Sequence, residues 1–191
     1  MALTLLTGPV ASGKSRLAAQ LASRWQGPVE VIVTAEGLDD EMRARIERHR
    51  AERPAAWRVR EEPLDLAVGL AALADDTFAI VDCLTLWTSN RLGAGDAPEA
   101  VIDRARAAAA LAAARAAPTV VVTNEVGWGI VPVNDLARVY RDLLGGVNGA
   151  FADHAESAWL VVAGRVMPLV RPDHIHLVAR SNVSTDPGAS A

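Results

Sequence analysis

Short apolar segments alternate with longer amphipathic segments along the 191 residues of the chain. Runs rich in Val, Leu, Ile and Thr predict buried strands at residues 3–7, 29–34, 78–82, 119–123 and 158–163. Apolar residues at helical spacing predict helices over 14–25, 40–52, 64–74, 84–92, 99–116 and from Asn134 or Asp135 to about 154. Strands that are apolar on both faces and alternate with helices predict an α/β fold, with a mostly parallel sheet covered by helices on both faces.

The segments between these elements have the composition of loops. Residues 53–63 contain two prolines, and residues 124–132 contain two glycines and a proline. No shift in composition marks a domain boundary, so we expect one domain over residues 1–178. Residues 179–191 are rich in Ser, Pro, Gly and Ala and are expected to form a flexible tail.

Composition and charge exclude several classes of protein. The formal net charge of −4 argues against a protein that binds nucleic acid by neutralising many phosphates. Cys83 is the one cysteine, so no disulfide can form within the chain and a reducing compartment fits. No apolar run approaches the ~20 residues that cross a bilayer. We therefore expect a cytoplasmic protein that neither binds nucleic acid nor inserts into a membrane.

Residues 8–15 match the phosphate-binding pattern G-x-x-x-x-G-K-[ST] in full, between a predicted strand and a predicted helix. The loop consists of Gly8, Pro9, Val10, Ala11, Ser12, Gly13, Lys14 and Ser15. Its backbone N–H groups and the helix N-terminus form a site for anions. Lys14 is the one lysine among nineteen basic residues, and its compact ammonium suits two phosphates better than a planar guanidinium does. Ser15 is a candidate Mg²⁺ ligand. The pattern predicts a nucleotide-binding protein with a P-loop NTPase-like fold.

Three polar residues follow predicted strands at the edge where α/β sheets bind ligands. Asp82 ends the third strand, either as a metal-organising acid or as the N-cap of the next helix. Asn124 and Glu125 follow the fourth strand, either as site residues or as a polar loop that binds its own backbone. The sequence leaves these alternatives open.

His49 shares a predicted helix face with Met42 and Ile46, which precede it by seven and three residues. This face is expected to turn inward. From periodicity alone, a half-buried histidine beside the core is the simplest interpretation.

The chain resembles the bifunctional adenosylcobinamide kinase / adenosylcobinamide-phosphate guanylyltransferase family of cobalamin biosynthesis, over roughly residues 3–165. The most distinctive matching segment, Thr-Asn-Glu-Val-Gly-Trp-Gly-Ile-Val-Pro, spans residues 123–132. Further matching segments lie at residues 13–15, 38–42, 45–49, 53–57, 136–138 and 141–142.

The resemblance implies two reactions. A nucleoside triphosphate first phosphorylates the hydroxyl of adenosylcobinamide. GTP then guanylylates a histidine with release of pyrophosphate, and the GMP passes to adenosylcobinamide phosphate. The family's histidine lies where His49 lies, and we expect Lys14 to act in catalysis by stabilising the pyrophosphate that leaves. Nucleotide contacts are implied for residues 8–15 and for Val33, Thr34, Ala35, Arg50, Ala51, Glu52, Arg53, Glu61 and Asp82.

The resemblance also implies Mg²⁺ as cofactor, GTP and ATP as substrates, a corrinoid acceptor and a homotrimer. Glu61 or Asp82 can accept hydrogen bonds from guanine, unless Asp82 instead joins Ser15 in holding Mg²⁺. Trp128 and its neighbours are either an apolar lip for the corrinoid or a contact with a neighbouring subunit. Two alternatives to this function remain: a small-molecule kinase with another acceptor and a structural His49, or a nucleotide sensor without activity.

The chain departs from the family pattern within its phosphate loop. Pro9 and Ala11 stand where the family commonly has a second glycine and an arginine. Loss of that arginine is expected to weaken triphosphate binding. Arg48 precedes His49 where the family often has a pair of histidines, so only one nucleophile is available there.

Overall fold

A computed structural model of the chain describes residues 3–37, 40–51 and 53–171, without the side chains of residues 41, 45 and 49. The strands are β1 (Leu3–Thr7), β2 (Val29–Val33), β3 (Arg58–Glu61), β4 (Phe78–Asp82), β5 (Thr119–Val122), β6 (Ser157–Val162) and β7 (Arg165–Leu169). The helices are α1 (Lys14–Ala22), α2 (Asp40–Ala51), α3 (Leu66–Ala71), α4 (Leu84–Gly93), α5 (Pro98–Ala114) and α6 (Asp135–His154). Within these residues no helix is long and apolar enough to span a bilayer.

The strands form a single sheet in the order β3-β2-β4-β5-β1-β6-β7. All neighbouring pairs are parallel except β6 and β7, which pair antiparallel. The predicted α/β fold with a mostly parallel sheet is therefore confirmed. β1, which leads into the phosphate loop, lies between β5 and β6 near the middle of the sheet.

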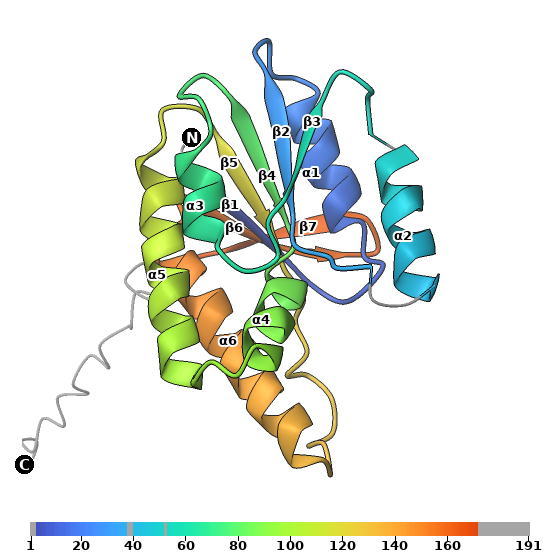
Figure 1. Ribbon diagram of the computed structural model, residues 1–191, viewed down its shortest axis with the longest axis vertical. Coiled ribbons are helices and arrows are strands. Elements are labelled where there is room, and N and C mark those ends of the chain that lie inside the picture. Colours follow the sequence, from blue (N-terminus) through green and yellow to red (C-terminus); the bar gives the residue numbers. More distant parts are fainter. Residues whose placement is uncertain (1–2, 38–39, 52, 172–191) are drawn as a thin grey trace, which may run out of the picture.

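Helices cover both faces of the sheet, and two apolar clusters fill the layers between them (Figure 1). Alternate residues of a strand point to opposite faces of the sheet and so belong to different clusters. In β4, Ala79 and Val81 belong to the cluster with α3, α5 and α6. Phe78 and Ile80 belong to the cluster with α1. This double burial explains why the central strands β1, β2, β4 and β5 have no polar face. Helix α2 lies at one margin of the molecule, on the side of the sheet that ends with β3 (Figure 1).

The prediction of a loop over the whole of residues 53–63 was wrong, because β3 lies within it. Its sequence, Arg-Val-Arg-Glu, is polar enough for a solvent-exposed edge strand, and hydrogen bonding to β2 rather than burial makes it a strand. An ion pair between Arg60 Nε and Glu30 Oε1, 2.7 Å long, joins the two strands. β7 was not predicted either; Pro168 lies in it, on the other edge of the sheet, where a missing N–H is tolerated.

Several helix ends differ from the prediction: α3 and α5 end at Ala71 and Ala114 rather than at residues 74 and 116. α1 ends at Ala22 rather than residue 25, and the Trp25 indole leaves the helix to donate a hydrogen bond to the Asp76 carbonyl at 3.1 Å. The N-cap of α4 is Cys83, so the interpretation of Asp82 as that cap was wrong. Asn134 caps α6 as predicted, since its side chain accepts a hydrogen bond from the Ala137 N–H at 3.1 Å. The predicted tail at 179–191 lies outside the described residues.

Candidate active site

The phosphate loop between β1 and α1 requires glycine at two positions. Gly8 and Gly13 have φ angles of +145° and +101°, which residues with a side chain rarely adopt. A Cβ atom on Gly8 would also lie 2.2 Å from the carbonyl oxygen of Val161. The loop is also held by the β6–β7 turn, where the Gly164 N–H donates to the Ser12 carbonyl at 2.9 Å.

The side chain of Lys14 folds back onto the loop that carries it. Lys14 is only 5% exposed, and its Nζ donates to Gly8 O at 3.0 Å, Pro9 O at 2.7 Å and Ser12 Oγ at 3.2 Å. Three acceptors thus converge on one nitrogen, which a compact ammonium can satisfy and a planar guanidinium cannot. This geometry supports the reason inferred for the single lysine of the chain.

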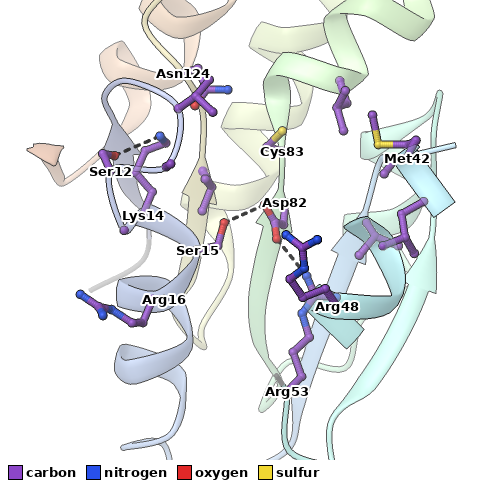
Figure 2. A pocket seen from close by; sticks show the side chains of 18 of the residues that line it. Ser12, Lys14, Ser15, Arg16, Met42, Arg48, Arg53, Asp82, Cys83 and Asn124 are labelled. Atoms are coloured by element: carbon purple, nitrogen blue, oxygen red, sulfur yellow. Dashed lines mark hydrogen bonds and ion pairs between the residues drawn. The ribbon is translucent and has the colours of Figure 1, made fainter. Parts of the chain in front are cut away.

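A cavity of about 730 Å³ opens beside this loop. It is lined by the loop and the start of α1, by the carboxyl ends of β2, β4 and β5 with the residues that follow them, by one side of α2 with Arg53 beyond it, and by the β6–β7 turn. The lining residues are Val10, Ala11, Ser12, Gly13, Lys14, Ser15, Arg16, Val33, Ala35, Met42, Ile46, Arg48, Arg53, Asp82, Cys83, Leu86, Val122, Asn124, Ala163 and Gly164. Lys14 and Arg16 come from the side of the loop and α1, and Arg48 and Arg53 come from the opposite side (Figure 2).

Asp82 is the acid at the centre of this basic cavity. Ser15 Oγ donates to its Oδ1 at 3.3 Å, and Arg53 Nη2 forms an ion pair with its Oδ2 at 2.9 Å (Figure 2). The side chains of Arg53 and Asp82 are 13% and 12% exposed, so little water screens the pair. A hydroxyl and a carboxylate at this separation are oxygen ligands of the kind that Mg²⁺ takes from a protein when phosphates complete its shell.

Helix α2 forms the far wall of the cavity. Met42 and Ile46 line it and are half-buried, so the predicted inward face is confirmed for these two residues. His49 belongs to the same helix, but its side chain lies outside what the structure describes. Its position on this face therefore stays a prediction.

Six predicted nucleotide contacts do not line the cavity: Gly8, Pro9, Thr34, Arg50, Ala51 and Glu61. Thr34 is fully buried, and its Oγ1 donates to the Cys83 carbonyl at 2.7 Å and accepts from the Cys83 N–H at 3.0 Å. It thus ties β2 to β4 beneath the cavity. Glu61 lies exposed at the end of β3, and Glu52 lies outside the described residues. Contacts of these residues with nucleotide stay predictions.

Several lining residues were not predicted. Arg16 directly follows the loop motif and Cys83 directly follows the predicted strand end at Asp82, so their sequence positions held a signal. Leu86 lies in the first turn of α4, which the predicted helix over 84–92 already placed after that strand end. Burial, and secondarily the Asp82 carboxylate, raises the pKa of the Cys83 thiol and keeps it protonated at neutral pH. Gly164 had no such signal, because β7 and the turn that leads to it were not predicted.

The segment after β5 is fixed by bonds to other elements rather than to itself. The Asn124 N–H donates to Thr85 Oγ1 at 3.0 Å, and Asn124 lines the cavity as its strand-end position indicated. Glu125 Oε1 accepts from Thr7 Oγ1 at 2.6 Å and from Asn148 Nδ2 at 3.1 Å. The interpretation of these residues as a loop that binds only its own backbone was wrong.

The sequence of the chain was matched to known protein families and proteins, and the matches fit a nucleotide-binding cavity. Residues 4–169 match the family model described as cobinamide kinase / cobinamide phosphate guanyltransferase. A bifunctional adenosylcobalamin biosynthesis protein, CobP of Pseudomonas aeruginosa, is 42% identical over 86% of this chain and 95% of its own length. Two proteins with the same description, CobU of Salmonella typhimurium and of Escherichia coli, are 42% and 40% identical over 85% of this chain and 96% of their own lengths.

Proposed function

The chain belongs to the cobinamide kinase / cobinamide phosphate guanyltransferase family, and from this premise we propose that it catalyses both reactions in the cavity beside the phosphate loop. In the first, ATP or GTP phosphorylates the hydroxyl of adenosylcobinamide. In the second, GMP passes from GTP through a histidine to adenosylcobinamide phosphate, giving adenosylcobinamide-GDP and pyrophosphate.

One observation supports both reactions in one site. The cavity has the phosphate loop on one side and helix α2, which carries His49, on the other. Of the charged side chains that line it in the described part of the chain, Lys14, Arg16, Arg48 and Arg53 are basic and Asp82 is acidic. An excess of positive charge at a helix N-terminus suits a triphosphate.

This arrangement supports a guanylyl transfer through His49. A nitrogen of the neutral His49 ring attacks the α-phosphorus of GTP, so that an N–P bond forms and the bond to the β-phosphate oxygen breaks. Lys14 stabilises the pyrophosphate that leaves. The acceptor phosphate then attacks the same phosphorus and displaces the imidazole. Covalent catalysis by His49 thus divides one displacement into two.

The residues present fit a magnesium ion. Ser15 Oγ and Asp82 Oδ1 would hold it, and it would neutralise charge on the β- and γ-phosphate oxygens. Because Ser15 and Arg53 already engage Asp82, the exposed Glu61 is the better acceptor for the guanine N–H groups.

We also propose a homotrimer. Exposed apolar side chains gather on the loop before α6, where Trp128, Ile130 and Val133 are 68%, 97% and 96% exposed. This loop and the first turns of α6 project beyond the rest of the described chain (Figure 1). Exposed apolar surface of this kind is typical of contacts with another molecule. Light scattering coupled to size exclusion tests the trimer, and a monomer at micromolar concentration contradicts it.

Incubation with GTP labelled at the α-phosphate tests the function. We expect an acid-labile, alkali-stable label on the protein that chases onto cobinamide phosphate and is absent from His49→Ala. His154→Ala is the matched control, because His154 lies at the C-terminal end of α6, away from the cavity, and should label normally.

The other outcomes identify the alternatives. A label that survives His49→Ala places the nucleophile elsewhere. Transfer from γ-labelled nucleotide alone, onto an acceptor that is not a corrinoid, indicates a different kinase. Nucleotide binding with no transfer to any acceptor indicates a sensor.

A further inference from the structure

The kinase reaction needs a group that removes the proton of the acceptor hydroxyl, and none of the described residues that line the cavity supplies a free carboxylate for it. Asp82 is the one carboxylate among those described lining residues, and Ser15 and Arg53 engage its two oxygens. Further carboxylates lie at the carboxyl ends of three other strands: Glu36 after β2, Glu61 and Glu62 at the end of β3, and Glu125 after β5.

Strand order separates these candidates. β5 is the immediate neighbour of β1, whereas β2 and β3 lie three and four strands away from it. At about 4.8 Å per strand, Glu36 is displaced by roughly 14 Å across the sheet, Glu61 and Glu62 by roughly 19 Å, and Glu125 by about 5 Å. Of these carboxylates, Glu125 is therefore the closest to the start of the phosphate loop.

A shared acceptor atom locates Glu125 more closely. The carbonyl oxygen of Gly8 accepts hydrogen bonds from both Lys14 Nζ, at 3.0 Å, and the Glu125 N–H, at 3.1 Å. The two nitrogens are thus at most about 6 Å apart. Since the lysine of a phosphate loop reaches the β- and γ-phosphates, the Glu125 backbone lies beside the end of the nucleotide that is transferred.

The carboxyl group is held in place through one of its oxygens. Thr7 Oγ1 and Asn148 Nδ2 both donate to Oε1, and Asn148 is itself buried and bonded to Thr123 Oγ1 at 2.6 Å. Among the described residues, no hydrogen bond engages Oε2 of this half-buried side chain. Hydrogen bonds to Oε1 thus fix the carboxylate of Glu125, while Oε2 can accept a proton.

We propose that Glu125 is the general base of the kinase reaction, which rests on the proposed function. Glu125 Oε2 takes the proton of the acceptor hydroxyl while the oxygen of that hydroxyl forms a bond to the γ-phosphorus. The bond between that phosphorus and the β–γ bridging oxygen breaks, and the nucleoside diphosphate leaves with the electron pair. Glu125 afterwards returns the proton to water. The guanylyl transfer uses no hydroxyl, because both nucleophiles, imidazole and phosphate, attack without losing a proton to a base.

The test is Glu125→Gln, with the two reactions measured separately. The amide oxygen can still accept from Thr7 and Asn148, so the fold and the loop are kept while the basic oxygen is lost. General bases contribute about 10²- to 10⁴-fold, so we expect the kinase kcat to fall at least about 100-fold with the KM for nucleotide little changed. Labelling of His49 by GTP and transfer of GMP to preformed cobinamide phosphate should stay at the wild-type rate, as should the melting temperature.

Glu156→Gln is the matched control, because this exposed residue precedes β6 and so lies at the amino end of that strand, whereas the cavity lies at the carboxyl ends of the parallel strands. Both of its activities should match the wild type. Kinase activity of Glu125→Gln at the wild-type rate, or equal losses of both reactions, would overturn the proposal and leave Glu125 a structural residue. Wild-type protein that phosphorylates no cobinamide would instead refute the proposed function, so the two failures are distinguishable.

Discussion

Replacement of Lys14 tests whether one phosphate loop serves both reactions. In Lys14→Met the chain keeps an aliphatic stem of similar length and loses the ammonium. The nitrogen now bonds three loop oxygens at 2.7 to 3.2 Å, and a bound triphosphate would exchange some of these for phosphate oxygens. Two hydrogen bonds between charged groups, at about 1.5–3 kcal/mol each, amount to roughly 3–6 kcal/mol of transition-state stabilisation.

At about 1.4 kcal/mol per factor of ten, kcat/KM should fall by about 10²- to 10⁴-fold for both reactions. Lys14→Arg keeps the charge and should fall by a similar factor, because its donors diverge in a plane while the three acceptors converge on a point. The kinase is assayed by release of nucleoside diphosphate and the transferase by protein label from α-labelled GTP. Thermal unfolding verifies that each variant is folded.

Arg24→Met is the control, since it removes an exposed cation just beyond the C-terminal end of α1. It should leave both reactions unchanged. Guanylylation at the wild-type rate in Lys14→Met, with only the kinase impaired, would refute the reasoning, because the GTP that reacts with His49 would then be held elsewhere.

Three further predictions concern the phosphate loop, the metal site and the stability of the protein at alkaline pH. Gly8→Ala places a Cβ 2.2 Å from the Val161 carbonyl oxygen, so both the melting temperature and calorimetric ATP affinity should drop; unchanged values would show that the loop shifts without cost. Asp82→Asn should raise the Mg²⁺ concentration for half-maximal activity about tenfold or more, and an unaltered Mg²⁺ titration would place the metal on other ligands. Burial, and secondarily Cys83, raises the pKa of Tyr140 from 10.0 to about 12. Above pH 10.0 the unfolded chain therefore loses a proton that the native state keeps. The contribution of Tyr140 to the free energy of unfolding is fully present below pH 10.0 and declines towards pH 12. In Tyr140→Phe, urea unfolding at about pH 9 and about pH 11 should show a smaller decline than in the wild type, and an equal decline would contradict that pKa.

The central strands could be predicted because they are buried on both faces. β1, β2, β4 and β5 consist almost entirely of apolar and β-branched residues, a pattern that local sequence alone displays. The two edge strands β3 and β7 are exposed and mixed in character, so the sheet itself, through backbone pairing with β2 and β6, makes them strands. Edge pairing leaves no periodicity in the sequence, and this is why both were missed.

The phosphate loop could be recognised from its residues without a structure, because its function resides in eight consecutive residues whose backbone groups bind the anion. The motif segments likewise carried the resemblance to the family. The surroundings of that loop could not be predicted from local sequence. The ion pair of Arg53 with Asp82 joins residues 29 apart, and the bond of Thr7 to Glu125 joins residues 118 apart. Strand order brings such residues together, and no local spacing encodes that order. For the same reason the Gly8 carbonyl, shared by Lys14 and Glu125, became visible only in the folded chain.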